Sequence, residues 1–137
     1  MMKKQILNSG PSIKNYNRIS DWLVLDEDNK IKINSGKIDI GQHISSTLAL
    51  ICSKITGVKY EQIEVIKLDT NFSPNEGKTA SSLSASHSGT AIKAASIELK
   101  NQFLEYVLLQ FNVEFNQIEF DNGIAKKKGT NKTVSYW

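Results

Sequence analysis

The fold is decided by the stretch from Ser84 to Phe111, which reads SASHSGTAIKAASIELKNQFLEYVLLQF. Apolar residues recur every four positions from Ala91 to Phe111, with further apolar residues beside them. This spacing places one apolar stripe on a helix, and it predicts a helix over 84–111. The first half of the stretch is rich in small residues, which allow another backbone or a ligand to approach closely. Gly89 lowers helix propensity by about 1 kcal/mol relative to Ala, so we expect a packing reason for it.

A second helix is predicted between His43 and Gly57. Gly57 stands where a left-handed C-terminal cap is expected, and Lys54 lies in the last turn, where a positive charge is favourable. Cys52 lies on the apolar stripe, so we interpret it as a core residue rather than a nucleophile, which would need exposure and a neighbouring base. The stripe consists of Ile44, Leu48, Ile51, Cys52 and Ile55.

Short apolar and alternating runs predict strands on both sides of these helices. The predicted strands are 22–25, 30–34, 37–40, 63–68, 118–120 and 124–126. The polar cluster 26–29 predicts the turn of a first hairpin, and Asn122-Gly123 predicts the turn of a second. Residues 71–77 contain Pro74 and Gly77 and therefore predict a loop.

The last residues predict a further helix, because Ser135 is a residue type that caps helices and two aromatic residues follow it. The predicted order is ββ–α–β–α–ββ, which indicates an α+β fold with two main helices packed on a small β-sheet and hairpins. We divide the chain into a flexible lead-in, 1–18, and one domain, 19–137, that ends as this further helix begins.

Composition excludes several classes of function. The net charge of +3 comes largely from Lys126-Lys127-Lys128, which are not interleaved with aromatic residues, so nucleic-acid binding is not expected. No apolar run approaches the roughly 20 residues that a membrane span requires. The two His and one Cys lack metal-ligand spacing, so no protein-ligated metal is expected. The single Cys and the absence of an apolar signal core favour a cytoplasmic location, with export inside an assembled complex as the alternative.

Two segments place small, hydrogen-bonding residues just before the predicted helices. They are Gly41-Gln42 and the hydroxyl-rich run from Thr79 to Ser84. Unpaired N–H groups and the helix dipole favour an anion at such a position. Residues of this kind serve more often as ordinary caps and turns, and by chemistry alone we favour that structural interpretation for both segments.

The stretch from Trp22 to Trp137 resembles the start of the molybdopterin-binding subunit of the xanthine dehydrogenase and aldehyde oxidase superfamily, in particular its isoquinoline 1-oxidoreductase branch. The matching motifs occur in order over roughly 115 residues, which makes the resemblance more specific than any one motif. They are Trp22-Leu23, Ser35 to Gln42, Thr47 to Ala49, Asp69-Thr70, Pro74 to Gly77, Thr79 to Ser84, Ser88 to Ala91 and Ser135 to Trp137.

This resemblance implies that 19–137 is part of a molybdopterin-binding domain whose cofactor is molybdopterin, often as the cytosine dinucleotide. The residues that the resemblance assigns to cofactor contact are Ile40, Gly41, Gln42, Thr79, Ala80, Ser81, Ser82, Leu83 and Ser84. It implies a molybdenum hydroxylase that hydroxylates an aldehyde or N-heterocycle with oxygen from water. The implied partners are the remainder of the molybdopterin-binding subunit and an iron–sulfur subunit.

The chain also departs from the family pattern. His43 stands where the loop usually has a second glycine, so its side chain either crowds the close approach, bonds a phosphate or faces solvent. The family's catalytic glutamate lies in a later part of the subunit, so we expect this chain to be inactive alone. The alternatives are a small non-redox binding module for a phosphorylated ligand and a decayed remnant.

Overall fold

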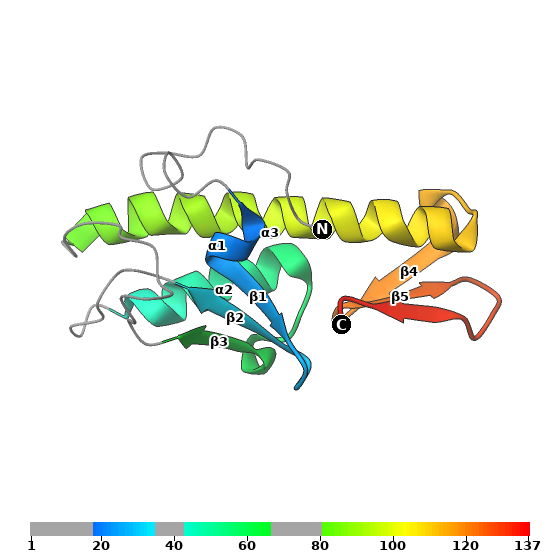
Figure 1. Cartoon of the computed structure of the whole chain (residues 1–137), viewed down its shortest axis with the longest axis horizontal. Coiled ribbons are helices and arrows are strands. Elements are labelled where there is room, and N and C mark those ends of the chain that lie inside the picture. Colours follow the sequence, from blue (N-terminus) through cyan, green and yellow to red (C-terminus); the bar gives the residue numbers. More distant parts are fainter. Residues whose placement is uncertain (1–17, 35–42, 67–80) are drawn as a thin grey trace.

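The computed structural model describes residues 18–34, 43–66 and 81–137 (Figure 1). In these residues two long helices pack with strands that form two three-stranded sheets, which confirms the predicted α+β class. The helices are α1 (Ile19–Trp22), α2 (Ile44–Thr56), η2 (Tyr60–Gln62), α3 (Ser81–Phe111) and η3 (Phe115–Gln117). The strands are β1 (Leu23–Asp26), β2 (Lys30–Asn34), β3 (Ile63–Ile66), β4 (Ile118–Asp121), β5 (Ile124–Lys127) and β6 (Thr133–Ser135).

The first sheet has the order β1-β2-β3. The predicted hairpin of β1 and β2 is confirmed, with Leu23 opposite Ile33 across the antiparallel pair. β3 runs parallel to β2, and Ile33 lies opposite Val65. A parallel pair needs a crossover connection, and α2 lies between these two strands in the chain. The hairpin could therefore be predicted from neighbouring residues, whereas the parallel pairing joins residues that are far apart in the sequence.

The start of the domain differs from the prediction. The lead-in predicted for 1–18 lies outside the described residues except for Arg18. Trp22 was predicted to begin the first strand, but it ends the short helix α1 and is fully buried. The reason is local, because the Asp21 carboxylate accepts a hydrogen bond from the Arg18 N–H at 3.0 Å and closes a capped turn.

The two main helices confirm most of their predicted features. α2 ends at Thr56 and is capped by Gly57, whose φ of 76° is left-handed and whose N–H donates to the Ser53 carbonyl. Cys52 is fully buried in the core, as predicted. α3 ends at Phe111 as predicted but begins at Ser81, three residues earlier than the periodicity indicated.

The second sheet is an antiparallel meander of β4, β5 and β6. Its first turn, Asn122-Gly123, has φ values of 47° and 77°, which confirms the predicted hairpin turn. The sequence predicted that Ser135 caps a helix begun by Tyr136 and Trp137, but Ser135 is the last residue of β6, which comprises Thr133–Ser135 and pairs with β5. β-branched residues favour a strand there, and the Tyr136 N–H donates to the Gly123 carbonyl.

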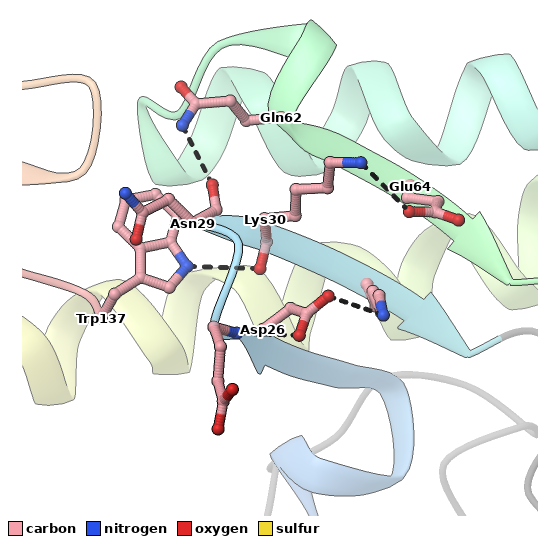
Figure 2. Close-up of polar contacts among 8 residues, drawn as sticks. Asp26, Asn29, Lys30, Gln62, Glu64 and Trp137 are labelled. Atoms are coloured by element: carbon pink, nitrogen blue, oxygen red, sulfur yellow. Dashed lines mark hydrogen bonds and ion pairs between the residues drawn. The ribbon is translucent and has the colours of Figure 1, made fainter.

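Contacts between distant residues join the second sheet to the rest of the protein. The Trp137 Nε1–H donates to the Lys30 carbonyl of the first sheet at 3.2 Å, as Figure 2 shows. The buried Tyr136 hydroxyl donates to the Thr56 carbonyl at 3.1 Å, and its ring lies 4.3 Å from that of Phe103 between centroids. The two sheets and α3 therefore enclose one continuous core.

Candidate functional site

The predicted site residues fall into two groups. Ile40, Gly41, Gln42, Thr79 and Ala80 lie outside the described residues. For Ser81–Ser84 the structure describes the backbone alone. These residues form the first turn of α3 instead of preceding the helix. Their N–H groups are therefore among those that an α-helix leaves without an internal partner.

The strand topology brings the flanks of both segments to one edge of the first sheet. The chain leaves β2 at Asn34 before the first segment and leaves β3 at Ile66 before the second. Asn34 and Ile66 are direct partners in the parallel pair. The last residues of β2 and β3 therefore lie about 5 Å apart. In open α/β sheets, ligands bind outside the carboxyl ends of parallel strands. The described strands thus supply the arrangement of a ligand-binding edge.

α2 and α3 return from these segments and run side by side in the same direction (Figure 1). Their contact is close at Gly89 of α3, where an added Cβ would lie 3.4 Å from Cδ1 of Ile51 on α2. This confirms the packing reason that the sequence predicted for Gly89. Because the two helices are parallel, both N-terminal dipole ends point to the same end of the molecule.

The first turns of both helices are suited to an anion. Neither α2 nor α3 has an acidic residue in its first turn. Asp and Glu are otherwise favoured there, because they complement the helix dipole, and they would repel a bound phosphate. This signal is present in the sequence itself, because residues 44–47 and 81–84 contain no Asp or Glu.

His43 occupies the junction before α2 in an unusual conformation. Its φ of 56° and ψ of 32° are left-handed, and its exposed side chain makes no capping hydrogen bond. The His43 carbonyl accepts the Thr47 N–H at 3.1 Å, so the backbone begins the helix normally. The backbone at this position therefore keeps a glycine-like conformation although it carries a side chain.

Other reactive groups lie away from this edge. Burial raises the pKa of the Cys52 thiol, and the neighbouring Ser96 and Thr56 hydroxyls oppose this shift in part. A raised pKa keeps the thiol protonated and unreactive, in agreement with its core position. Across 18–34, 43–66 and 81–137, no three His, Cys, Asp or Glu side chains gather in a way that would hold a metal ion. None of the helices described there is long and apolar enough to span a membrane.

The fold defines a class of protein, an α+β domain in which two adjacent parallel strands, β2 and β3, are each followed in the chain by a long helix. Comparison with known families makes the class specific. The chain belongs to the molybdopterin cofactor-binding domain family, whose model matches residues 2–137. This confirms the resemblance of residues 22–137 to the molybdopterin-binding subunit of that superfamily.

The individual relatives are distant in sequence. One of the subunits of nicotinate dehydrogenase from Pseudomonas putida is 20% identical over 113 residues, which cover 82% of this chain and 9% of the relative. Xanthine dehydrogenase of Blastobotrys adeninivorans is 28% identical over 79 residues, which cover 58% of this chain and 6% of the relative. The chain thus spans less than a tenth of the length of these curated relatives.

Solved structures share the fold. The CO dehydrogenase of Oligotropha carboxidovorans matches with a TM-score of 0.68 and 20% identity, and quinoline 2-oxidoreductase of Pseudomonas putida 86 with 0.62 and 16%. Each match covers 83% of this chain and 14% of the solved chain. At these identities the likeness shows the fold alone.

Proposed function

We propose that this chain is the cofactor-contacting N-terminal segment of a molybdenum hydroxylase. The observation that carries the proposal is the parallel pair β2–β3, whose carboxyl ends adjoin at Asn34 and Ile66. The helices that follow them begin at the same end of the molecule without acidic residues in their first turns. The described residues thus fit a phosphorylated cofactor, and membership of the molybdopterin cofactor-binding family names that cofactor.

In this proposal the chain binds and the cofactor reacts. The first turns of α2 and α3, with the segments 40–42 and 79–80, hold the phosphate groups of molybdopterin, in its cytosine dinucleotide form. The bound molybdenum supplies the hydroxylation chemistry, in which water provides the oxygen and an aldehyde or N-heterocycle is the substrate. The names of the relatives, among them nicotinate and xanthine dehydrogenases, support this substrate class.

The proposed partners follow from the same relatives. The chain matches only 14% of the length of the solved relatives, so we propose that the rest of the molybdopterin-binding subunit completes the cofactor site. An iron–sulfur subunit would carry the electrons away. The chain is then inactive alone, because the family's catalytic glutamate belongs to the later part of the subunit.

The test adds a negative charge where the phosphate is expected. Ser82→Asp places a carboxylate in the first turn of α3, and Asn101→Asp adds the same charge at an exposed position in the middle of that helix. The Asp at position 82 stabilises the helix dipole by about 0.3–1 kcal/mol, so loss of binding would not reflect unfolding. Each tagged chain is purified from its native cells, and molybdenum and acid-released cytidine monophosphate are measured per chain.

We expect at least a tenfold loss of molybdenum with Ser82→Asp and none with Asn101→Asp. Equal molybdenum in both variants would contradict the proposed site. A wild-type chain that purifies alone and without metal, yet binds cytidine diphosphate in a fluorescence titration, would indicate a non-redox binding module instead. Aggregation of the wild-type chain without either ligand would indicate a remnant.

A further inference from the structure

A polar residue, Asn34, is buried at the edge where β2 and β3 end. It is the last residue of β2 and the direct partner of Ile66 across the parallel pair. Only 8% of Asn34 is exposed, although asparagine is mostly a surface residue. Side chains alternate along a strand, so Asn34 belongs to the face of Lys32 and not to the core face of Ile33. The burial of Asn34 is therefore not explained by the hydrophobic core.

The carboxamide of Asn34 forms no hydrogen bond with another residue that the structure describes. The other buried polar residues of the described ranges lie inside the core. The Thr56 hydroxyl donates to the Cys52 carbonyl at 2.7 Å, and Ser96 lies beside the Cys52 thiol. A carboxamide can donate two hydrogen bonds and accept two, and its burial without partners costs free energy. At an edge suited to ligands, an unpaired carboxamide indicates a ligand with complementary polar groups.

The charges near Asn34 favour an uncharged part of that ligand. Lys32, two residues before Asn34, places its Nζ 2.6 Å from Oδ2 of Asp26. Lys30, further along the same face, pairs with Glu64 at 3.7 Å, as Figure 2 shows. Both lysines of β2 are thus compensated by carboxylates, and this face does not attract a phosphate in the way that the first turns of α2 and α3 do.

The chemistry of a carboxamide matches one kind of uncharged group particularly well. Its donor N–H lies beside an acceptor oxygen, so it can form two hydrogen bonds with a heterocycle that has an amino group next to a ring nitrogen. Asparagine pairs with adenine in DNA in this way. The pterin and the cytosine of molybdopterin cytosine dinucleotide both have an edge of this kind.

We infer that Asn34 is a specificity-determining residue that pairs with an amino-heterocycle of the cofactor, while the first turns of α2 and α3 hold its phosphates. This inference rests on the proposed function, which supplies the cofactor. The unpaired carboxamide lowers the stability of the cofactor-free chain and gains its partner when the cofactor binds. The same group penalises a ligand that lacks the matching edge, because the carboxamide then stays unpaired.

The test separates a role in binding from a role in folding. Asn34→Leu replaces the carboxamide with an apolar side chain of similar shape, and Asn34→Asp keeps the shape but removes the N–H donors. Asn131→Leu is the matched control, because Asn131 is an exposed asparagine in the connection between β5 and β6. Molybdenum and acid-released cytidine monophosphate are measured per chain after purification of each tagged chain from its native cells. Thermal unfolding is measured on the same chains produced in cells that do not make the cofactor.

In the absence of cofactor, we expect Asn34→Leu to unfold at the same temperature as the wild type or at a higher one. From native cells, both Asn34 variants should carry at least fivefold less cofactor than the wild type, and Asn131→Leu should carry as much. Loss of cytidine monophosphate alone would assign the pair to the cytosine, and parallel loss of molybdenum would assign it to the pterin.

Two results would overturn the inference while the proposed function stands. The first is a full content of molybdenum and cytidine monophosphate in Asn34→Leu. The second is a lower unfolding temperature of cofactor-free Asn34→Leu, which would show that the carboxamide supports the fold. A wild-type chain that carries neither molybdenum nor cytidine monophosphate would overturn both the inference and the proposed function.

Discussion

The two halves of α3 are packed in opposite ways, although they belong to one continuous helix. In the N-terminal half most of the buried residues are small, among them Gly89, Ala91 and Ala95, with Ile92 as the large exception, and the helix backbone comes close to α2. In the C-terminal half they are large, and Phe103 meets Phe120 and Tyr136 with ring centroids 5.8 and 4.3 Å apart. Side-chain size along α3 therefore sets two distances between this helix and its neighbours. Small residues allow α2 to lie close to the N-terminal half, and large residues fill the wider space between the C-terminal half and the second sheet.

The largest expected effect on stability lies in the C-terminal half of α3. Phe103→Ala removes a side chain that is 8% exposed at the centre of the aromatic cluster. Loss of its buried surface and the cavity left behind should lower the free energy of unfolding by about 3–5 kcal/mol. Urea denaturation followed by circular dichroism measures this change. A loss below about 1 kcal/mol would show that the second sheet is not held by this ring.

A smaller effect is expected at the hydroxyl that links the second sheet to α2. Tyr136→Phe removes the donor to the buried Thr56 carbonyl and should cost about 1–2 kcal/mol at neutral pH. Denaturation of both proteins at pH 7 provides the measurement. Unchanged stability would mean that water or another donor replaces the hydroxyl.

The same residue predicts a pH dependence. Burial raises the pKa of the Tyr136 hydroxyl above its ordinary value of 10.0. Above that pH the unfolded chain loses this proton while the folded chain retains it, so stability falls as pH rises. Denaturation between pH 9 and 11 should show a steeper loss for the wild type than for Tyr136→Phe. Parallel curves would contradict a buried, protonated tyrosine.

The smallest effects on stability are expected in the N-terminal half of α3. An added Cβ at Gly89 meets Ile51 at an ordinary contact distance, so Gly89→Ala should gain up to about 1 kcal/mol from helix propensity. Gly89→Leu places a larger, branched side chain where there is no room for it. This variant should lower the free energy of unfolding by about 1–3 kcal/mol. Thermal unfolding of the two variants gives the sign of each change. Stabilisation by both would show that α2 and α3 do not need their close approach.

The sequence predicted those elements whose signals are local. Periodicity located α2 and α3, Gly57 marked a helix end, and Asn122-Gly123 marked a hairpin. It did not predict that β3 pairs with β2 in parallel, because the partners Ile33 and Val65 are brought together only through α2. The short helix α1 is too brief for a periodic pattern, and β6 depends on pairing with β5.

For the candidate site, the sequence predicted the family, but the individual cofactor contacts stay untested. The motif resemblance identified the family, which the family comparison confirms. Residues 40–42, Thr79 and Ala80 lie outside the described residues, so their contact with the cofactor stays a prediction. The sequence did not supply the adjacency of Asn34 and Ile66, from which the chain leaves β2 and β3 toward the two predicted segments.

The indole hydrogen bond of Trp137 has a consequence for the order of folding. Its partner, the Lys30 carbonyl, is 107 residues away, and the Tyr136 hydroxyl reaches across 80 residues to Thr56. Closing such long loops costs entropy, so the hairpins and helices should form first and these two bonds last. The same bonds should then open early, which makes the β4–β6 meander a unit of local unfolding. In amide hydrogen exchange, the meander should exchange together and ahead of the β1–β3 sheet.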